Sequence, residues 1–127
     1  MTGGHTVTIH PCDSHVEVHL DGELLASTDR PLRLDETGLP ARYYIPRVDV
    51  RQDLLVSSET ITQCPYKGRA EYWSVRIGDK EYKDLVWSYP FPIAECPKIA
   101  QLVSFFNERV DIYVDGELEI RPRTMWS

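Results

Sequence analysis

The side chains best suited to chemistry lie in one segment, residues 38–75, whose most pointed motif is Cys-Pro-Tyr-Lys-Gly at residues 64–68. Cys64 supplies a thiol, and the ammonium group of Lys67, three residues later, could stabilise the thiolate and make it nucleophilic. A thiol nucleophile usually needs a general base, and none of the four histidines lies close to Cys64 in the sequence. The alternative is a structural role, in which Cys64 packs in the core beside the proline turn and Lys67 is solvated.

The charged residues of this segment also suit ligand binding. The guanidinium of Arg42 offers a planar fork and Lys67 offers a point charge, so that with Asp49 they could hold an anionic or polar molecule. The alternative is a structural ion pair of Arg42 with Asp49 or Glu71.

Aromatic residues accompany these charges, and their spacing indicates which of them reach a cavity. Because successive side chains of a strand point to opposite faces, one of Tyr43 and Tyr44 should face the core while the other is free to line a pocket. The same holds for Tyr72 and Trp73. The sequence therefore predicts a cleft with aromatic walls. Its ligand-binding residues are expected to be Arg42, Tyr43, Tyr44, Asp49, Cys64, Lys67, Tyr72 and Trp73.

Histidines near the N-terminus suggest a metal site as an alternative, because imidazole and thiolate are ligands of zinc. His15 and His19 lie on one predicted strand and would be ~13 Å apart, too far to share an ion. His10, Cys12 and His15 would converge only through a turn at Pro11. We expect these side chains to be solvated on an edge hairpin, and we expect no metal and no cofactor. The motifs GxxxxGK[ST], GxGxxG, HExxH and GxSxG are also missing from the sequence.

Length and composition indicate a single domain over residues 1–127, with residues 1–14 expected to be an irregular N-terminal segment. A chain of 127 residues can bury roughly two-thirds of its unfolded surface, so a core forms without staples. Apolar residues make up 42% and charged residues 27%, as in soluble globular proteins. The net charge of −6 argues against nucleic acid as a partner, because phosphate binding needs a basic face.

The cysteines and the N-terminus indicate the cellular compartment. Cys12, Cys64 and Cys96 form no CxxC pair, and three cysteines can build neither a complete disulfide framework nor a zinc site of four cysteines. Reduced thiols in the cytoplasm fit best. The N-terminus has no basic region and no apolar core of a signal peptide, and no apolar run approaches the ~18 residues of a membrane span. We therefore expect a cytoplasmic protein that has no membrane partner.

The elements that position the candidate site are predicted to be mostly strands. Residues 15–20 alternate between apolar and polar side chains, Asp21-Gly22 favours a two-residue hairpin turn, and residues 23–28 return antiparallel. Residues 110–121 repeat this design, because five of the twelve are identical to residues 16–27. An ancient duplication and the independent use of one hairpin design both explain the repeat. Both predict two Asp-Gly hairpins that flank the central segment.

Three further strands are predicted at residues 42–45, 71–77 and 85–89. Between the first two, Asp49 is predicted to cap a short helix, because its carboxylate can accept a hydrogen bond from a backbone amide. That helix would turn Val50, Leu54 and Leu55 inward.

One longer helix is predicted to begin at Pro97, a residue that suits the first helical position. Apolar residues follow with the spacing i, i+3, i+4 and i+7 that is typical of a helix with one buried face; they are Ile99, Leu102, Val103 and Phe106. Asn107 would end the helix in the left-handed conformation. The predicted fold class is mainly β, with one packed α-helix near the C-terminus.

Motifs in the central segment resemble a bacterial family catalogued as domain of unknown function 427. They are LPxRYYIPxxDV at residues 39–50, TxCPYKGxAxYWSV at 62–75 and DLVWSY at 84–89, followed by the predicted helix and YVDGE at 113–117. The resemblance covers residues 16–119. It implies a β-tent-like architecture, in which two small antiparallel sheets meet at an angle over a shared pocket. It also implies a metal-free variant, because the paired CxxC motifs through which some relatives of that class bind zinc are missing.

Some classifications label this family nucleotidyltransferase-like. Such enzymes need a Gly-Ser turn followed by paired acidic residues that hold magnesium, and the sequence has no such block. We therefore do not carry this activity over, and the family supplies no known catalytic residues.

The sequence predicts an uncharacterised small cytoplasmic β domain that binds a small polar or anionic molecule in an aromatic-lined cleft. One alternative is an enzyme that uses Cys64 or Lys67 on a metabolite. Another is a protein-interaction module or homo-oligomer that pairs through an exposed strand edge or through the repeated hairpins.

Overall fold

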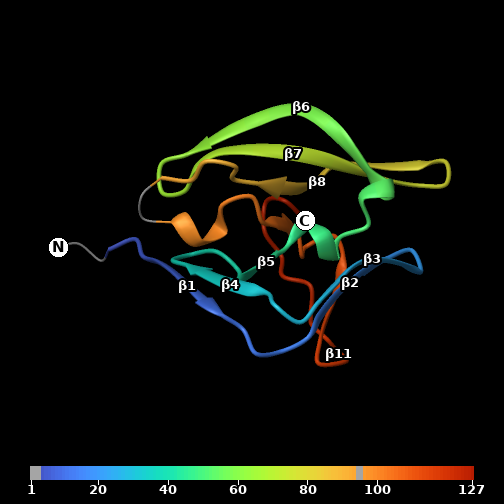
Figure 1. Cartoon of the computed structure of the whole chain (residues 1–127), viewed down its shortest axis with the longest axis horizontal. Coiled ribbons are helices and arrows are strands. Elements are labelled where there is room, and N and C mark those ends of the chain that lie inside the picture. Colours follow the sequence, from blue (N-terminus) through green and yellow to red (C-terminus); the bar gives the residue numbers. More distant parts are fainter. Residues whose placement is uncertain (1–3, 94–95) are drawn as a thin grey trace.

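Alternating side chains and tight turns arrange the chain as two antiparallel sheets, seen in a computed structural model that describes residues 4–93 and 96–127 (Figure 1). The larger sheet contains, in spatial order, β1 (Val7–Pro11), β4 (Leu32–Glu36), β5 (Arg42–Ile45), β9 (Val103–Phe105), β8 (Lys80–Ser88), β7 (Gly68–Ile77) and β6 (Leu55–Cys64). The smaller sheet contains β11 (Glu117–Leu118), β10 (Asp111–Val114), β2 (Val16–Leu20) and β3 (Glu23–Thr28). The prediction of a mainly β fold with two antiparallel sheets is confirmed.

Both predicted Asp-Gly hairpins are present, and both lie in the smaller sheet. Asp21 and Gly22 join β2 to β3 with φ angles of 51° and 79°, and Asp115 and Gly116 join β10 to β11 with 51° and 83°. Positive φ at both central residues is the geometry whose twist matches that of the flanking strands.

The two similar hairpins pair with each other through β2 and β10. In this antiparallel pair Val18 lies opposite Ile112, and Val16 lies opposite Val114. Val18 and Ile112 are also equivalent positions of the sequence repeat. A local two-fold axis therefore passes through the Val18–Ile112 pair, and the repeat is used to build one sheet from two copies of a hairpin.

The α-helix predicted near the C-terminus is wrong, and the described residues contain only short 3₁₀ helices: η1 (Arg47–Asp49), η2 (Gln52–Leu54) and η3 (Pro97–Ile99). After the single turn of η3, Gln101 adopts φ 62°, which a right-handed helix cannot accommodate. Residues 103–105 then form β9 between β5 and β8. A strand that is buried on both faces carries apolar residues on both faces, and some of these can also match the i, i+3 and i+4 spacing of a helix. No described helix has the length and apolar character needed to cross a membrane.

Asp49 does not cap a short helix as predicted: it is the last residue of η1, and the short 3₁₀ helix that follows, η2, has Arg51 as its N-cap. The Asp49 carboxylate accepts a hydrogen bond from the Thr28 hydroxyl (2.7 Å) and not from a backbone amide. Val50 is nevertheless buried, as expected, because the chain here runs against β3 and forms an isolated bridge with Ala26.

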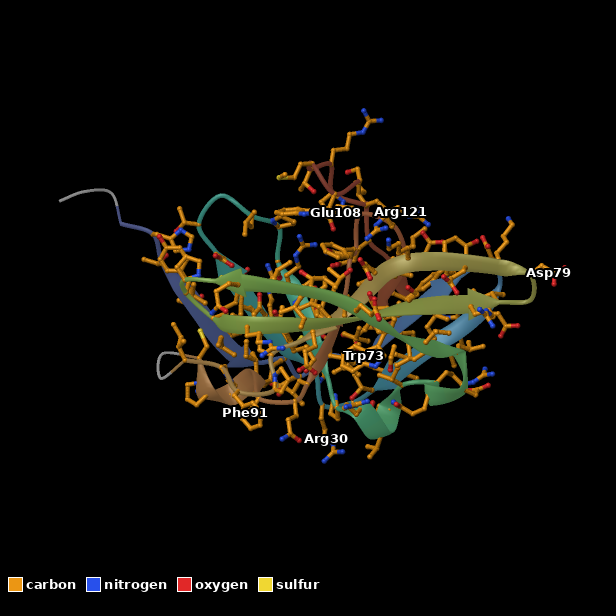
Figure 2. The ribbon with its side chains drawn as sticks, turned by 90° about the horizontal axis from the view of Figure 1, so that it is seen from above. Arg30, Trp73, Asp79, Phe91, Glu108 and Arg121 are labelled. Atoms are coloured by element: carbon orange, nitrogen blue, oxygen red, sulfur yellow. The ribbon has the colours of Figure 1, made fainter. Side chains whose placement is uncertain are left out.

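The larger sheet is strongly curved, so that β6 and β7 arch over β4 and β5 (Figure 1). Register shifts interrupt β6–β7 pairing between Ser57 and Ile61 and β7–β8 pairing between Trp73 and Val75. Bulges of this kind bend strands and increase their twist. Seen from above, Asp79 lies at the far tip of the β7–β8 hairpin (Figure 2).

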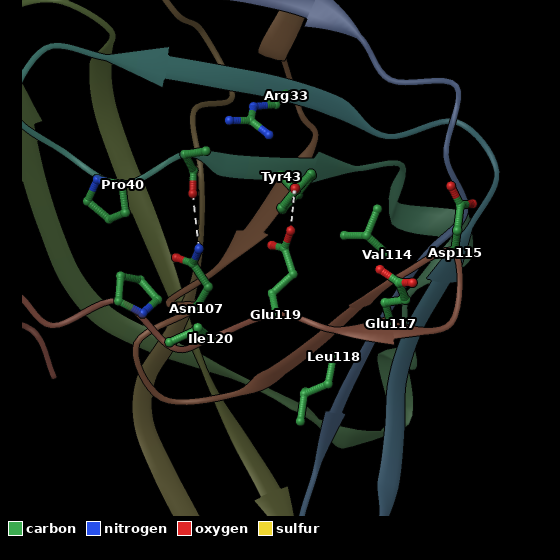
Figure 3. A pocket seen from close by; sticks show the side chains of 12 residues that line it. Arg33, Pro40, Tyr43, Asn107, Val114, Asp115, Glu117, Leu118, Glu119 and Ile120 are labelled. Carbon is green, nitrogen blue, oxygen red and sulfur yellow. Dashed lines mark hydrogen bonds between the residues drawn. The ribbon is translucent and has the colours of Figure 1, made fainter.

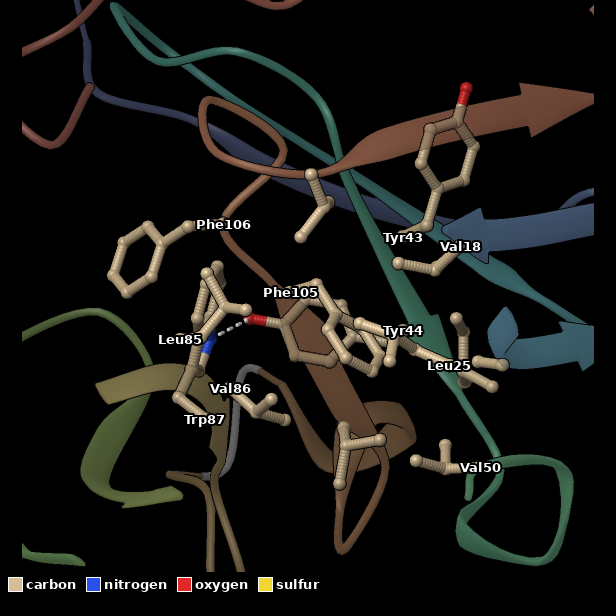
Figure 4. Packing of buried hydrophobic residues seen from close by; sticks show 14 of the residues in the cluster. Val18, Leu25, Tyr43, Tyr44, Val50, Leu85, Val86, Trp87, Phe105 and Phe106 are labelled. Carbon is tan, nitrogen blue, oxygen red and sulfur yellow. Dashed lines mark hydrogen bonds between the residues drawn. The ribbon is translucent and has the colours of Figure 1, made fainter. Parts of the chain in front are cut away.

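The core lies between the sheets and is built around strands β5, β8 and β9. Figure 4 shows Tyr44 inside this cluster, where its hydroxyl accepts a hydrogen bond from Nε1 of Trp87 (3.0 Å). Tyr44 is fully buried, and its neighbour Tyr43, which is also buried in the cluster, points to the other face of β5 (Figure 4). The side chains of Tyr43 and Tyr44 thus point to opposite faces of the strand, as the alternation along a strand predicts.

Candidate functional site

Arg42, on β5, is buried and held by two partners from the loop after β9. Its Nη1 donates to Glu108 Oε1 (2.5 Å) and to Asn107 Oδ1 (2.5 Å), while Nη2 donates to Glu108 Oε2 (3.0 Å). The Asn107 amide in turn donates to the carbonyl of Ala41 (3.0 Å). Arg42 and Glu108 therefore form a buried bidentate pair whose orientation is fixed by a neighbouring amide.

The bonds to Glu108 and Asn107 leave one edge of the Arg42 guanidinium unused. A guanidinium carries five N–H donors, and three of them are taken by these partners. The other two, on Nε and Nη2, lie on one edge of the planar group and have no acceptor among the described residues. This edge has the shape that binds a carboxylate through two parallel hydrogen bonds.

Lys67 is positioned by the tight turn between β6 and β7. Cys64 pairs with Gly68 across the base of this turn, and the Lys67 amide donates to the Cys64 carbonyl (3.4 Å). Gly68 has φ 115°, and a Cβ there would lie 3.3 Å from backbone atoms of Phe91, Pro92 and Ile93. The glycine of the Cys-Pro-Tyr-Lys-Gly motif is therefore required by both conformation and close approach.

The turn directs Lys67 inward, where its ammonium group meets a buried carboxylate. Nζ donates to Oε1 of Glu36, at the end of β4, over 2.6 Å. The second oxygen of Glu36 lies 2.9 Å from Nε2 of His5, whose ring stacks on Tyr66 at a centroid distance of 3.7 Å. The side chains of Lys67 and Glu36 are only 8% and 5% exposed, while His5 is 27% exposed. These groups form a continuous chain of contacts from a buried amine to the surface.

Arg42 and Lys67 line the same small cavity, with a volume of about 100 Å³. Its walls are mostly aromatic, and its lining residues are Leu39, Arg42, Lys67, Tyr72, Trp87, Tyr89, Phe106 and Trp126. Neither Glu36 nor Glu108 belongs to this lining. The two cations therefore face the cavity, and their carboxylate partners lie behind them.

Aromatic rings hold both cations in place. The Arg42 guanidinium carbon lies 5.3 Å from the ring centroid of Trp87 and 5.8 Å from that of Trp126. Lys67 Nζ lies 5.7 Å from the ring centroid of Tyr89. At these distances the negative face of a ring attracts a cation, and the attraction is stronger where water is excluded.

Tyr89 brings an unused polar group to the cavity. The residue is 6% exposed, and its hydroxyl makes no hydrogen bond with any described residue. Burial raises the pKa of Tyr89 above its ordinary value, so the hydroxyl keeps its proton. The hydroxyl is therefore available to donate a hydrogen bond to water or to a ligand in the cavity.

Glu108 is held in its charged form despite its burial. Burial, the largest influence, favours the protonated acid, but hydrogen bonds from Arg42, Thr124 and the backbone outweigh it and lower the pKa of Glu108. The Thr124 hydroxyl donates to Oε2 over 2.5 Å. This bond attaches the C-terminal segment to the ion pair and places Trp126 at the cavity, where it stacks on Phe106 with centroids 6.1 Å apart.

The structure brings together three of the residues predicted to bind a ligand: Arg42, Lys67 and Tyr72. Tyr44 lies in the core next to this group, because its hydroxyl bonds to Trp87, a lining residue. Asp49 lies elsewhere, in η1, where it bonds to Thr28.

Cys64 and Trp73 also lie outside the cavity lining. Cys64 is half-buried and packs against the core as an apolar residue, the arrangement expected of a structural cysteine. Trp73 is half-buried against the core, with the Arg47 guanidinium carbon 4.9 Å from its ring centroid. The structure therefore gives no support to Cys64 as the nucleophile of this cavity.

Tyr43 lines a different and larger groove, of about 710 Å³, between β5 and the C-terminal hairpin (Figure 3). Its hydroxyl donates to the carboxylate of Glu119 (3.3 Å), and Asp115 and Glu117 lie nearby in the lining. The cation of this groove, Arg33, is already paired with Asp35. The groove is larger than the aromatic cavity, but it offers no comparable set of buried, convergent polar groups, so we regard the smaller cavity as the candidate site.

The histidines near the N-terminus form hydrogen-bond pairs. Nδ1 of His15 lies 2.6 Å from Asp29, and Nε2 of His19 lies 2.8 Å from Glu17. Within residues 4–93 and 96–127, no three His, Cys, Asp or Glu side chains cluster in a way that could hold a metal ion.

Sequence reasoning missed several residues of this site. Trp87 and Tyr89 lie in the DLVWSY motif, which could have directed attention to them. The two carboxylates carry no such signal, because Glu36 is 31 residues from Lys67 and Glu108 is 66 residues from Arg42. Trp126 carries no such signal either, because it joins the cavity only through the way the C-terminal segment folds back.

Comparison with known proteins places the chain in a family. Residues 8–116 match the model of a family described as a domain of unknown function, DUF427. No curated protein matches the chain. The matched residues include Arg42, Lys67 and Tyr89 and exclude Trp126. Because the match covers most of the chain, the protein belongs to the DUF427 family.

Proposed function

We propose that this domain binds a small carboxylate in the cavity between β5, β7 and β8. The observation that carries the proposal is the direction of the two buried ion pairs: Arg42 and Lys67 face the cavity, and their partners Glu108 and Glu36 do not. A ligand in the cavity therefore meets positive charge at close range between aromatic walls, where electrostatic attraction is stronger than in bulk water.

Two donors suit a carboxylate in particular. The unused edge of Arg42 can donate two parallel hydrogen bonds, and the Tyr89 hydroxyl can donate a third. The aromatic walls would contact the apolar part of the ligand. Drug-sized pockets measure about 300–1,000 Å³, so a cavity of about 100 Å³ suits a molecule of only a few non-hydrogen atoms.

We further infer that the domain works in the cytoplasm. The thiols of Cys12 and Cys64 support this inference, since neither forms a disulfide, and such thiols persist in a reducing compartment.

Thermal-shift titration with propionate tests the proposed ligand class. Propionate is expected to raise the melting temperature in a saturable way, because a ligand that binds only the native state stabilises it. Tyr89→Phe removes one hydroxyl without changing the ring. We expect it to leave the melting temperature of the free protein unchanged or higher, and to weaken propionate roughly tenfold, the value of one charge-assisted hydrogen bond.

Tyr113→Phe is the matched control, because Tyr113 lies on β10 in the other sheet and outside the cavity lining. It should not change the affinity for propionate. If propionate gives no shift, or if the two variants weaken it equally, the proposed function is wrong. In the first case the native mass at several concentrations would test the alternative of an interaction module.

A further inference from the structure

We propose that Lys67 is a nucleophilic amine that forms an imine with the carbonyl group of a small 2-oxo acid. The inference rests on the proposed function, since the Arg42 edge would hold the carboxylate of that acid. It goes further because it assigns covalent chemistry to the second cation of the cavity.

The surroundings of Lys67 are those of a reactive amine and not those of a surface lysine. Its side chain is only 8% exposed, and its ammonium group lies above the Tyr89 ring in the aromatic cavity. Lysines enclosed in such cavities serve as amine nucleophiles when a neighbouring group can accept their proton. Among the four lysines of the sequence, Lys67 is the one in the cavity lining.

Glu36 supplies the proton acceptor that such an amine needs. An ammonium group must lose a proton before its lone pair can attack a carbonyl carbon, and Oε1 of Glu36 lies 2.6 Å from Nζ. The other oxygen of Glu36 contacts His5, whose imidazole is partly exposed and stacked on Tyr66. His5 therefore positions the carboxylate and leads from it to the protein surface.

The step balances with the groups present. Lys67 passes one proton to Glu36, and the neutral amine adds to the carbonyl carbon to give a carbinolamine. The carbinolamine oxygen then leaves as water, carrying the proton returned by Glu36 and a second hydrogen from the nitrogen. The nitrogen thus loses two hydrogens and gains a double bond to carbon, and no oxidant or reductant is required. The Tyr89 hydroxyl can donate a hydrogen bond to the oxygen as charge develops on it.

Reductive trapping tests the proposal in the full-length protein. Pyruvate is added with sodium cyanoborohydride, and the modified lysine is located by peptide mass mapping. We expect a single reduced adduct on Lys67, formed at least tenfold faster than on Lys80, whose side chain is 73% exposed. Propionate, which has the carboxylate but no carbonyl, should give no adduct and should slow trapping by competing for the cavity.

Two variants separate chemistry from binding. Lys67→Arg keeps a cation opposite Glu36 but cannot form an imine, so it should abolish the adduct. Glu36→Gln keeps the shape of the partner and removes the proton acceptor; we expect trapping to slow at least tenfold while propionate, followed by thermal shift, still binds at least as tightly as to wild type, because a negative charge next to Lys67 is lost. A purely structural role of Glu36 would instead change affinity and trapping together.

The outcomes distinguish the two proposals. If propionate binds but pyruvate gives no adduct on Lys67, or modifies Lys80 as fast, imine formation is refuted and the carboxylate site remains. If wild-type protein neither binds propionate nor traps pyruvate, both proposals fail. Equal trapping in wild-type protein and Glu36→Gln would overturn the role of Glu36 as proton acceptor.

Discussion

Replacing Gly68 by alanine should damage the protein more than any other glycine-to-alanine change at a hairpin. Gly68 has φ 115°, a region that side-chain-bearing residues rarely adopt. A methyl group there would also lie 3.3 Å from the Phe91 oxygen, the Pro92 Cα and the Ile93 nitrogen. All three are backbone atoms, so the contact cannot be relieved by rotating a side chain.

The expected magnitude follows from these two costs. An unfavourable backbone conformation costs about 1–3 kcal/mol, and moving a backbone segment that packs this closely adds roughly 1 kcal/mol or more, as in overpacked cores. Gly68→Ala should therefore lower the free energy of unfolding by about 2–4 kcal/mol. For a domain of this size each kcal/mol corresponds to roughly 4 °C, which gives a fall in melting temperature of about 10 °C.

Gly78→Ala is the matched control, because Gly78 also lies in a hairpin turn with positive φ (59°) but has no atom within 4 Å of the added Cβ. It pays only the conformational cost, about 1–2 kcal/mol. Urea denaturation followed by tryptophan fluorescence measures both variants. An equal loss of stability in the two would refute the close approach of residues 91–93 to the turn.

The Gly68→Ala change should also affect the site, because the Ile93 amide donates to the Lys67 carbonyl over 3.0 Å. Displacing residues 91–93 breaks this contact and moves Lys67. At a temperature where both variants are folded, Gly68→Ala should weaken propionate binding and Gly78→Ala should not. Unchanged binding in Gly68→Ala would show that the turn does not position the amine.

Two further predictions concern the surroundings of Arg42, the other cation of the site: its partner Glu108 and its neighbour Trp126. The pKa of Glu108 is lower in the folded protein than its ordinary value of 4.5. Its charged form therefore contributes stability that is present above pH 4.5 and is lost as the pH falls through the pKa of the folded state. The melting temperatures of Glu108→Gln and wild type should converge at acid pH, and a difference that stays constant with pH would contradict this. Trp126→Ala removes one wall of the cavity, so phenylpyruvate binding should strengthen relative to propionate in calorimetric titrations, and an unchanged ratio would show that this ring does not limit ligand size.

Local signals were sufficient where a structure depends on neighbouring residues. The Asp-Gly turns were predictable because positive φ at two consecutive positions restricts the residues that fit. The helix predicted from Pro97 fails for the opposite reason. Ile99, Val103 and Phe106 are apolar because they are buried, and the spacing of buried residues cannot distinguish a helix from a short turn followed by a central strand.

The candidate site could be predicted only in part, because half of each ion pair is distant in sequence. Arg42 and Lys67 stand in recognisable motifs, but which carboxylates they meet is decided by the curvature of the larger sheet and by the loop after β9. The expected partners of Arg42, Asp49 and Glu71, lie elsewhere: Asp49 bonds to Thr28, and Glu71 is exposed on β7. Pairing between distant strands is a tertiary property that local spacing does not encode.

Two buried ion pairs in one small domain are better explained by a binding site than by stability. Removing an ion pair from water costs several kcal/mol per charge, and hydrophobic replacements are often as stable or more so. If the two ion pairs served only stability, it would not matter which member of each pair lines the cavity. Here both cations face one cavity, both carboxylates stand behind them, and the unused donors of Arg42 and Tyr89 lie in the same lining. The asymmetry of the pairs, more than their number, supports the proposal that the cavity binds an anion.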